Sequence, residues 1–315
     1  MDCKLKLDFE KTTSLFLAYP EGVIDCGIDC SSASKVFDEL IKAIPRNTNL
    51  VVFVKSAEIS KKVGRLHRNT TTLVNNELSS IWLRDSAGFN MGTHIVKPIF
   101  KPKYYRKYFE EAALIDQNMK IIHSILGIDM VKIPLVWDCG NLVTNGEIGF
   151  ITDQVLADNK KSHDEAQVKE IIRSNLKIEP VLIPTHPDDI FGHTDAYLSF
   201  LNRSTLAISK YQENANKKDL KYLEEVKTIV HKYVSNVIEI RENPTFEENN
   251  NIESAKGLYV NFLSLGNLIF MPSYENSDDE KYNKDLLSKY GKVYPIQCDE
   301  LAAFGGLLHC VSFTN

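Results

Sequence analysis

The residue best suited to covalent chemistry is Cys310, which lies close to the C-terminus after the pair Gly305-Gly306. Because glycine lacks a side chain, the backbone there can turn tightly or approach a ligand closely. An unperturbed thiol with a pKa of about 8.5 is only about 3% thiolate at neutral pH, and full ionisation needs roughly 2 kcal/mol of stabilisation. A nearby cation, such as a cationic substrate, would supply it. Cys310 is therefore a candidate nucleophile, with the alternative that it is a small core residue.

Four further clusters of polar residues interrupt strand-like runs, where burial costs several kcal/mol unless the groups are paired or used. They are Trp82-Leu83-Arg84-Asp85, Trp137-Asp138-Cys139-Gly140-Asn141, Gly192-His193-Thr194-Asp195 and Tyr259-Val260-Asn261. On a strand, His193 and Asp195 would project from the same face, and a His beside a carboxylate can serve as a general acid/base. Singly, each cluster also has a structural interpretation as an ion pair or as core aromatics.

Five segments with apolar residues at helical spacing are expected to be helices that position these clusters. They cover Val36 to Ile44 and residues 104–126, 163–176, 218–236 and 278–290. Ser162 with Glu165, and Ser277 with Glu280, have the spacing of a capping box at two of the helix starts.

Each expected helix is followed by a short β-rich run. These runs are Leu50 to Val54, Met130 to Val136, Val181 to Ile183, Val237 to Ile240 and Lys292 to Ile296. Extended sequence also precedes each helix, and three of these stretches are expected to be hairpins. Their turns are Asn145-Gly146, Asn202-Arg203-Ser204 and Gly266-Asn267.

The repeating unit is thus strand, strand, helix, strand, and five units in 315 residues give about 63 residues each. This rhythm predicts an α/β fold closed into a five-bladed propeller, in which the polar clusters would meet at the axis. An open α/β sandwich with the same element order is the alternative. The polar stretch from Asn243 to Ser254 lacks periodicity and is expected to be a surface loop.

The composition argues against several classes of protein. The net charge of −5 and pI near 5.9 argue against nucleic-acid binding. The first twenty residues lack the apolar stretch of a signal peptide or membrane helix, so we expect a cytoplasmic protein without a membrane partner. The six cysteines are expected to be thiols. Cys26 and Cys30 lack a second Cys/His pair at zinc-ligand spacing, and no metal is expected.

In this order and spacing, the clusters resemble the agmatine deiminase and Porphyromonas-type peptidylarginine deiminase family of the guanidine-modifying pentein superfamily. The resemblance runs from Ser14-Leu15-Phe16-Leu17-Ala18-Tyr19-Pro20 to the Cys310 segment. It implies one catalytic domain over residues 1–315 with the five-bladed pentein propeller fold. It also implies a small cationic guanidino substrate and no cofactor, and it allows a homodimer.

The resemblance implies roles for residues near the middle of the chain. IWLRDSAGF is similar to the family's Trp-x-Arg-Asp motif, in which the aspartate, here Asp85, clamps the guanidinium. Arg84 would orient Asp85 or the substrate tail, and Trp82 would line the site. FGHTDAY resembles the Gly-His-x-Asp motif, which implies that His193 is the general acid/base and Asp195 the second guanidinium-binding carboxylate.

Three further motifs carry the remaining roles. WDCGN resembles a motif with an acidic residue, which places Asp138 and Asn141 in the substrate site, and GLYVNF matches a site-lining motif with Asn261 as its polar member. GGLLHCVSF resembles the terminal motif that carries the nucleophile Cys310. In the implied reaction, the thiolate adds to the guanidinium carbon, His193 protonates the departing ammonia, and water hydrolyses the thiouronium.

Several departures from the family pattern leave the substrate open. Ser86-Ala87-Gly88 replaces a Gly-Pro step, Cys139 a glycine, Leu307 an asparagine, and Asp138 a longer glutamate. Agmatine deimination to N-carbamoylputrescine is the nominal reaction, with arginine, peptidyl-arginine or citrulline as alternative substrates of the same chemistry. A catalytically inert binding module and a Cys-His protease or acyltransferase are alternatives from other classes.

Overall fold

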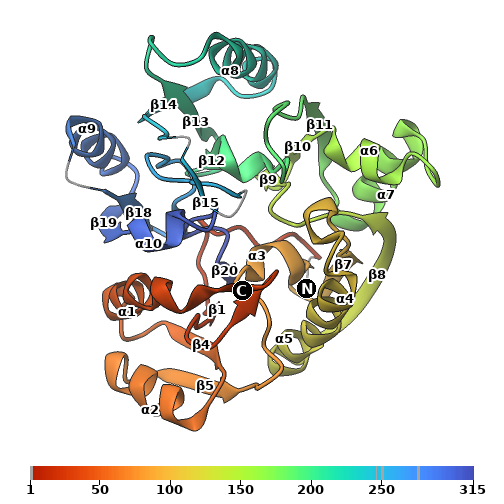
Figure 1. Ribbon diagram of the computed structural model, residues 1–315. Helices are drawn as coiled ribbons and strands as arrows, with labels where there is room; N and C mark the ends of the chain where they lie inside the picture. Colours follow the sequence, from red (N-terminus) through yellow and green to blue (C-terminus); the bar gives the residue numbers. More distant parts are fainter. Residues whose placement is uncertain (1–2, 246, 250–251, 275–276) are drawn as a thin grey trace. The chain divides into compact units, whose positions relative to one another are not determined.

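The computed structural model describes residues 3–245, 247–249, 252–274 and 277–315. The chain forms two compact units. The middle unit contains the chain up to Leu7 together with Asp85–Glu239, and the terminal unit contains Asp8–Arg84 together with Ile240–Asn315. Both units are mixed α/β structures, and the same strand-strand-helix-strand pattern recurs within each (Figure 1).

The middle unit contains three successive three-stranded sheets. In each sheet an antiparallel hairpin comes first, and the chain then passes through helix before it adds the third strand. In the first two sheets this third strand is parallel to its neighbour. The elements are β6 (Phe89–Asn90), β7 (His94–Ile99), α4 (Phe109–Asn118), α5 (Lys120–Leu126), β8 (Asp129–Val136), β9 (Val143–Thr144), β10 (Ile148–Thr152), α6 (Gln154–Asn159), α7 (Glu165–Leu176), β11 (Glu179–Ile183), β12 (Leu198–Phe200), β13 (Thr205–Tyr211), α8 (Lys217–Val230) and β14 (Asn236–Glu242).

The terminal unit contains two sheets of the same pattern, one of them assembled from both ends of the chain. The elements are β1 (Ser14–Ala18), α1 (Ser34–Ala43), β4 (Asn49–Val54), α2 (Ala57–Leu66), β5 (Thr70–Val74), β17 (Leu263–Leu265), β18 (Leu268–Ser273), α9 (Asp278–Leu287), β19 (Lys292–Gln297) and β20 (Ser312–Thr314). The last strand, β20, pairs antiparallel with β1, so that Phe16 lies opposite Phe313. Strand β1 is parallel to β4 on its other side. All five β1 side chains are buried, as expected for a central strand covered on both faces.

Short elements complete the described chain. They are β2 (Ile24–Asp25), β3 (Ile28–Asp29), β15 (Glu248–Asn249), β16 (Ile252–Glu253), the one-turn helices α3 (Leu83–Ser86) and α10 (Asp299–Ala302), and the 3₁₀ turns η1 (Cys30–Ala33), η2 (Lys103–Tyr105) and η3 (Thr194–Ala196). The segment 243–254, expected to be an irregular loop, contains the β15–β16 hairpin. Residues 246, 250 and 251 of that segment lie outside the described residues.

The predicted order of elements is confirmed. The five strands expected after helices are β4, β8, β11, β14 and β19, and the expected hairpins are β9–β10, β12–β13 and β17–β18. The closure of these repeats into a propeller stays a prediction. Helix α2 and strand β5 were not predicted; they extend the β1–β4 sheet by a second parallel crossover.

The helix expected over residues 104–126 is wrong in its extent. Residues 103–105 form the turn η2, and Tyr108, with φ −132° and ψ 40°, cannot continue a helix into α4. A left-handed Gly127 ends α5. The helix expected to reach residue 236 ends at Val230, and the one expected to reach 290 ends at Leu287.

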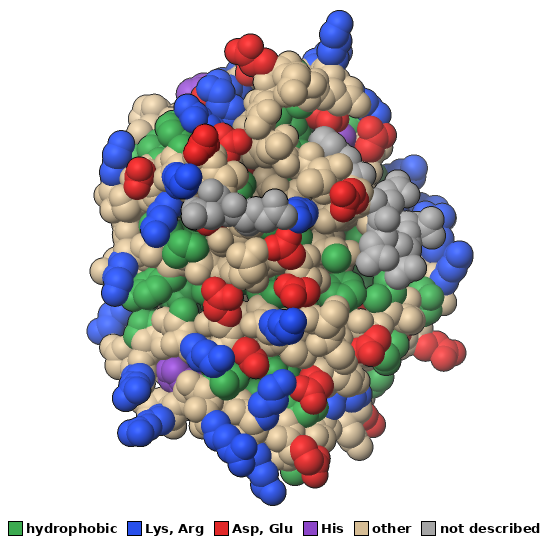
Figure 2. Space-filling view, turned by 60° about the vertical axis from the view of Figure 1, so that its left-hand side comes forward, with side chains coloured by type: hydrophobic (Ala, Val, Ile, Leu, Met, Phe, Trp, Pro, Cys, Tyr) green, Lys and Arg blue, Asp and Glu red, His purple; other side chains and the backbone are tan. Residues whose placement is uncertain are grey.

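Two general features are the apolar length of the helices and the distribution of charge on the surface. Among the described helices, none is long and apolar enough to cross a bilayer. On the face shown in Figure 2, acidic and basic side chains are interspersed across the centre, with hydrophobic side chains between them. Charge of one sign therefore does not gather over that part of the surface.

Of the two serines at capping-box spacing, Ser277 is confirmed as an N-cap, while the Glu280 carboxylate accepts from Ser273 Oγ and the Tyr274 amide. Ser277 caps α9 by accepting a hydrogen bond from the Glu280 amide. Helix α7 is capped by Asp164 instead of Ser162, because Asp164 accepts from the Gln167 amide while the Gln167 side chain accepts from the Asp164 amide, both at 2.9 Å.

This difference can be tested with a matched pair. Asp164→Ala should lower the free energy of unfolding by about 1 kcal/mol, because it removes the cap of α7. The exposed Ser162→Ala should change it by less than about 0.5 kcal/mol. Urea unfolding followed by circular dichroism measures both, and equal effects of the two variants would contradict this assignment of the cap.

Candidate active site

In the middle unit the structure brings together His193, Asp138 and Asp85. His193 Nε2 lies 3.2 Å from Asp138 Oδ2, and His193 Nδ1 lies 3.6 Å from Asp85 Oδ1. All three side chains are at most 11% exposed. Asp138 follows the end of β8, where the chain leaves the sheet, and Asp85 is held in the one-turn helix α3.

Asp195 lies in the same unit but not as the sequence predicted. His193 precedes the turn η3, and Asp195 is inside it, so the two residues do not lie on one strand. The polar groups interrupt the sheets because they sit in the connections between strands. Asp195 is only 3% exposed, and its negative charge acts on His193.

These carboxylates determine the charge of His193. Burial alone would lower the pKa of the imidazole, but the negative charge of Asp85, the hydrogen bond to Asp138, and the charges of Asp138 and Asp195 outweigh it. Together they raise the pKa of His193 to about 10. The imidazole is therefore a cation at neutral pH and holds a proton that it can donate.

Gly140 is required by the closeness of these groups. A Cβ atom at this position would lie 2.5 Å from Asp85 Oδ1 and 2.9 Å from His193 Nδ1. The backbone on both sides is also fixed, because the Cys139 amide donates to the Asp85 carbonyl and the Asp195 amide donates to the Gly140 carbonyl. Because glycine has no side chain, the backbone can pass directly beside the side chains of Asp85 and His193.

Asn141 holds together the backbone segments that carry these side chains. Its Oδ1 accepts hydrogen bonds from the Thr152 amide at 2.8 Å and from Thr194 Oγ1 at 2.7 Å. Its carbonyl accepts from Trp137 Nε1 at 3.0 Å. These bonds connect the β8 end, strand β10 and the turn η3, which positions Asp138 and His193 relative to each other.

A pocket in the middle unit is lined in part by His193 and Asp138. Aromatic rings of Tyr104, Trp137 and Phe191 contribute to its lining, together with Lys103 and Asp158. The Lys103 ammonium lies 3.1 Å from the Asp158 carboxylate. The pocket thus offers aromatic surface and an ion pair next to the acid/base candidate.

The terminal unit holds Cys310. Its Sγ lies 3.2 Å from Asn261 Nδ2 and 3.4 Å from Asn261 Oδ1. The amide can accept from the thiol or donate to the thiolate, so it serves both protonation states. Asn261 also fixes His309, the residue before Cys310, because the Asn261 Oδ1 and carbonyl both accept from the His309 amide. The buried Glu242 holds this segment by accepting from the Tyr259 and Val260 amides, both at 2.7 Å.

Arg84 is used to hold the Cys310 segment. Its guanidinium pairs with Asp8 at 2.8 Å, its Nε donates to the His309 carbonyl at 3.4 Å, and its amide donates to the Cys310 carbonyl at 3.1 Å. Burial would raise the pKa of Asp8, but the Arg84 charge and the hydrogen bonds from His309 and Thr314 hold it well below its usual range. Asp8 is thus an anion that binds Arg84, His309 and Thr314 within this unit.

Trp82 lies against the glycines before the nucleophile candidate. A Cβ atom on Gly306 would come within 2.5 Å of the Trp82 ring. The two glycines therefore permit close packing of an aromatic ring on the backbone, and Gly305 has a φ of +81° that favours glycine.

Two other cysteines are poor competitors for nucleophilic chemistry. Burial raises the pKa of the Cys139 thiol to about 12, and burial raises that of Cys298 well above its usual value. Both stay protonated at neutral pH.

Comparison with known proteins decides the family. The family model for Porphyromonas-type peptidyl-arginine deiminase matches residues 4–315. The chain belongs to this family. It is therefore a hydrolase of C–N bonds in the guanidine-modifying group, as the motifs predicted. A predicted agmatine deiminase of Photobacterium profundum is 21% identical to this deiminase over an alignment of 358 positions, gaps included, that covers 98% of this chain and 94% of the relative.

Solved structures share the fold of this deiminase. A C. jejuni agmatine deiminase with substrate bound has a TM-score of 0.83 at 14% identity, covering 99% of this chain and 96% of that one. An agmatine deiminase of Enterococcus faecalis gives 0.79 at 15%, covering 99% and 95%. A dimethylarginine dimethylaminohydrolase of Pseudomonas aeruginosa complexed with citrulline gives 0.57 at 10%, covering 97% and 100%. The mixed α/β fold is that of the pentein superfamily.

Residues outside the quoted motifs also contact the candidate residues within each unit of this deiminase. Asp8 carries no sequence signal, because a single acidic residue near the N-terminus resembles any surface carboxylate. Tyr104, whose hydroxyl donates to Asp138 Oδ2 at 2.9 Å, lies in a stretch that looked like an amphipathic helix. Only the folded chain shows that these residues reach the motifs.

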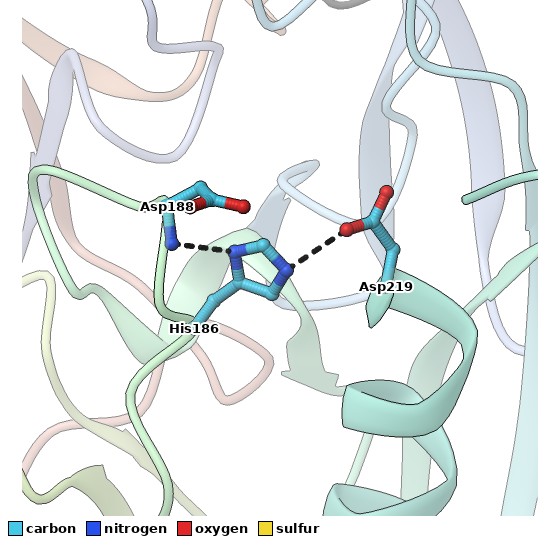
Figure 3. Close-up of side chains that lie close together, drawn as sticks. All are labelled: His186, Asp188 and Asp219. Atoms are coloured by element: carbon cyan, nitrogen blue, oxygen red, sulfur yellow. Dashed lines mark hydrogen bonds and ion pairs between the residues drawn. The ribbon is translucent and has the colours of Figure 1, made fainter. Parts of the chain in front are cut away.

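A separate cluster on the middle unit consists of His186, Asp188 and Asp219 (Figure 3). The His186 Nδ1 accepts from the Asp188 amide at 3.3 Å, and Nε2 donates to Asp219 at 3.1 Å. The Asp188 carboxylate pairs with Lys218 at 2.6 Å. Both ring nitrogens and the exposed carboxylate are thus already engaged, and the cluster joins the start of α8 to the segment after β11.

The environment of Gly140 gives a direct test. Gly140→Ala should lower the free energy of unfolding by about 1 to 3 kcal/mol, since its methyl group would displace Asp85 or His193. Gly64→Ala is the control, because nothing lies within 4 Å of its added methyl in helix α2. The control should gain up to about 1 kcal/mol from helix propensity. If both variants were equally stable by urea unfolding, the close contact at Gly140 would be refuted.

Proposed function

We propose that this deiminase hydrolyses a small guanidine through a covalent Cys310 intermediate, nominally converting agmatine and water to N-carbamoylputrescine and ammonia. The observation that carries the proposal is the buried grouping of His193 with Asp85, Asp138 and Asp195, a cation-binding set of carboxylates beside a proton donor. Such perturbed ionisable groups concentrate at functional sites. The reaction as proposed needs no metal or organic cofactor and takes place in the cytoplasm.

Each of these residues acts in a defined step of the proposed reaction. The Cys310 thiolate adds to the guanidinium carbon, and Asp85 and Asp195 bind the planar cation through charge-assisted hydrogen bonds. His193 gives its proton to the departing ammonia, which leaves a thiouronium on sulfur. Water then attacks the same carbon and loses one proton to His193. As the carbon–sulfur bond breaks, the remaining hydroxyl proton passes to solvent, the ureido product departs and the Cys310 thiolate is restored.

The pocket supports a substrate whose tail lacks a carboxylate. A free arginine or citrulline needs a cation for its carboxylate, whereas agmatine needs an anion or an aromatic ring for its amine. Among the residues that line the pocket, Lys103 is already paired with Asp158, while Tyr104, Trp137 and Phe191 present aromatic rings. Agmatine is accordingly the first substrate to test, followed by peptidyl-arginine.

The experiment is ammonia release by the purified protein with agmatine, arginine, a blocked arginine peptide, citrulline and methylated arginines. One of these should turn over, and Cys310→Ala should lower the rate about a thousandfold or more, because the nucleophile is lost. The half-exposed Cys3→Ala is the control and should keep full activity.

Two results would contradict the proposal. Turnover that survives Cys310→Ala would remove the covalent step. Failure to release ammonia from every compound by a folded protein would favour the inert binding module instead.

A further inference from the structure

We propose that Tyr104 is a positioning residue of this site, which holds Asp138 against His193 and keeps His193 able to release a proton during the reaction. The inference rests on the proposed function and deepens it. It assigns a role to a residue that none of the sequence motifs contains.

Geometry is the first support. The Tyr104 hydroxyl donates to Asp138 Oδ2 at 2.9 Å, and His193 Nε2 lies 3.2 Å from the same oxygen. The Tyr104 ring is edge-on to His193 and to Phe191, with centroids 6.3 and 5.0 Å apart. One carboxylate oxygen therefore joins two side chains that come from the turn η2 and from the residue before η3.

The direction of the hydrogen bond is fixed by charge. Burial, together with the negative charges of Asp138 and Asp85, raises the pKa of Tyr104 well above its usual value. The phenol consequently stays protonated and can only donate to the carboxylate. By donating, it takes up part of the negative charge that Asp138 would otherwise present to the imidazolium.

The effect on His193 follows from the groups that face it. Within the described middle unit these are the carboxylates of Asp85, Asp138 and Asp195, and the Tyr104 phenol reaches one of them. Without the phenol, Asp138 would attract the imidazolium more strongly and the proton would be harder to remove. Because Nε2 is bound to Asp138, the proton on Nδ1 is the one exchanged in the reaction.

The two half-reactions respond differently to such a change. Thiouronium formation needs His193 as a proton donor, which a more basic imidazole still provides. Hydrolysis needs His193 to accept a proton from the attacking water, and this requires the neutral imidazole. Loss of the Tyr104 hydroxyl should therefore slow the second half-reaction and let the Cys310 adduct accumulate.

Tyr104→Phe removes only the hydroxyl, and Tyr105→Phe is the matched control from the same turn, with its ring 5.4 Å away. Tyr104→Phe should lower kcat about tenfold or more and lower KM by a similar factor, because slowing only the step after adduct formation leaves kcat/KM nearly unchanged. Intact-protein mass spectrometry during turnover should show the thiouronium on Tyr104→Phe and far less on the wild type and Tyr105→Phe. Far-UV circular dichroism should show that both variants are folded at the assay temperature.

A second readout does not depend on turnover. Imidazole NMR of the Cys310→Ala protein, with and without Tyr104→Phe, should show His193 titrating at higher pH in the double variant. Should the proposed function itself fail, this comparison still decides the role of Tyr104. Equal titration in the two proteins, or equal kcat and adduct levels in Tyr104→Phe and Tyr105→Phe, would overturn the inference.

Discussion

Buried carboxylates around one imidazole constrain the architecture of the middle unit. Asp85, Asp138 and Asp195 are removed from water, and a buried negative charge is tolerated only when positive charge or hydrogen-bond donors compensate it. His193 supplies that charge in the free protein. The same carboxylates are suited to a guanidinium, and in the free protein the His193 cation stabilises them. Four side chains, those of His193 and the three carboxylates, share this small volume. Gly140 leaves room for them because it has no Cβ, and Asn141 holds the surrounding backbone through its hydrogen bonds.

The terminal unit holds Cys310, the candidate nucleophile, through contacts with several parts of the chain. Strand β20 is paired with β1, so the residues after Cys310 belong to a buried sheet. On the other side, the Asp8 carboxylate and Arg84 bind the His309-Cys310 backbone, and Asn261 contacts the sulfur directly. The position of Cys310 therefore depends on Asp8, Arg84 and Asn261, which lie far apart in the sequence.

Local sequence patterns predicted the strands, hairpins and most helices because each arises from residues close in sequence, as in the Asn145-Gly146 turn between β9 and β10. The motif residues were also found, since polar groups in apolar runs stand out. Contacts between distant residues left no such signal. Asp164 displaced Ser162 as a cap by two residues, and His193 precedes the turn that contains Asp195 instead of sharing a strand with it. Tyr104 and Asp8 each reach motif residues of their own unit only through folding. Nothing in the sequence distinguishes Asp8, Tyr104 or Asp164 from surface polar groups.

The central claim is that carboxylates hold His193 as a cation in the resting protein. The measurement is a pH titration of the imidazole NMR signals, with His193 assigned among the 8 histidines by its loss in His193→Gln. We predict that His193 remains protonated at pH 8 and loses its proton near pH 10, well above the pKa of about 6.5 of a free imidazole. A midpoint at or below 6.5 would show that burial outweighs the carboxylates, and would contradict the account of the site given above.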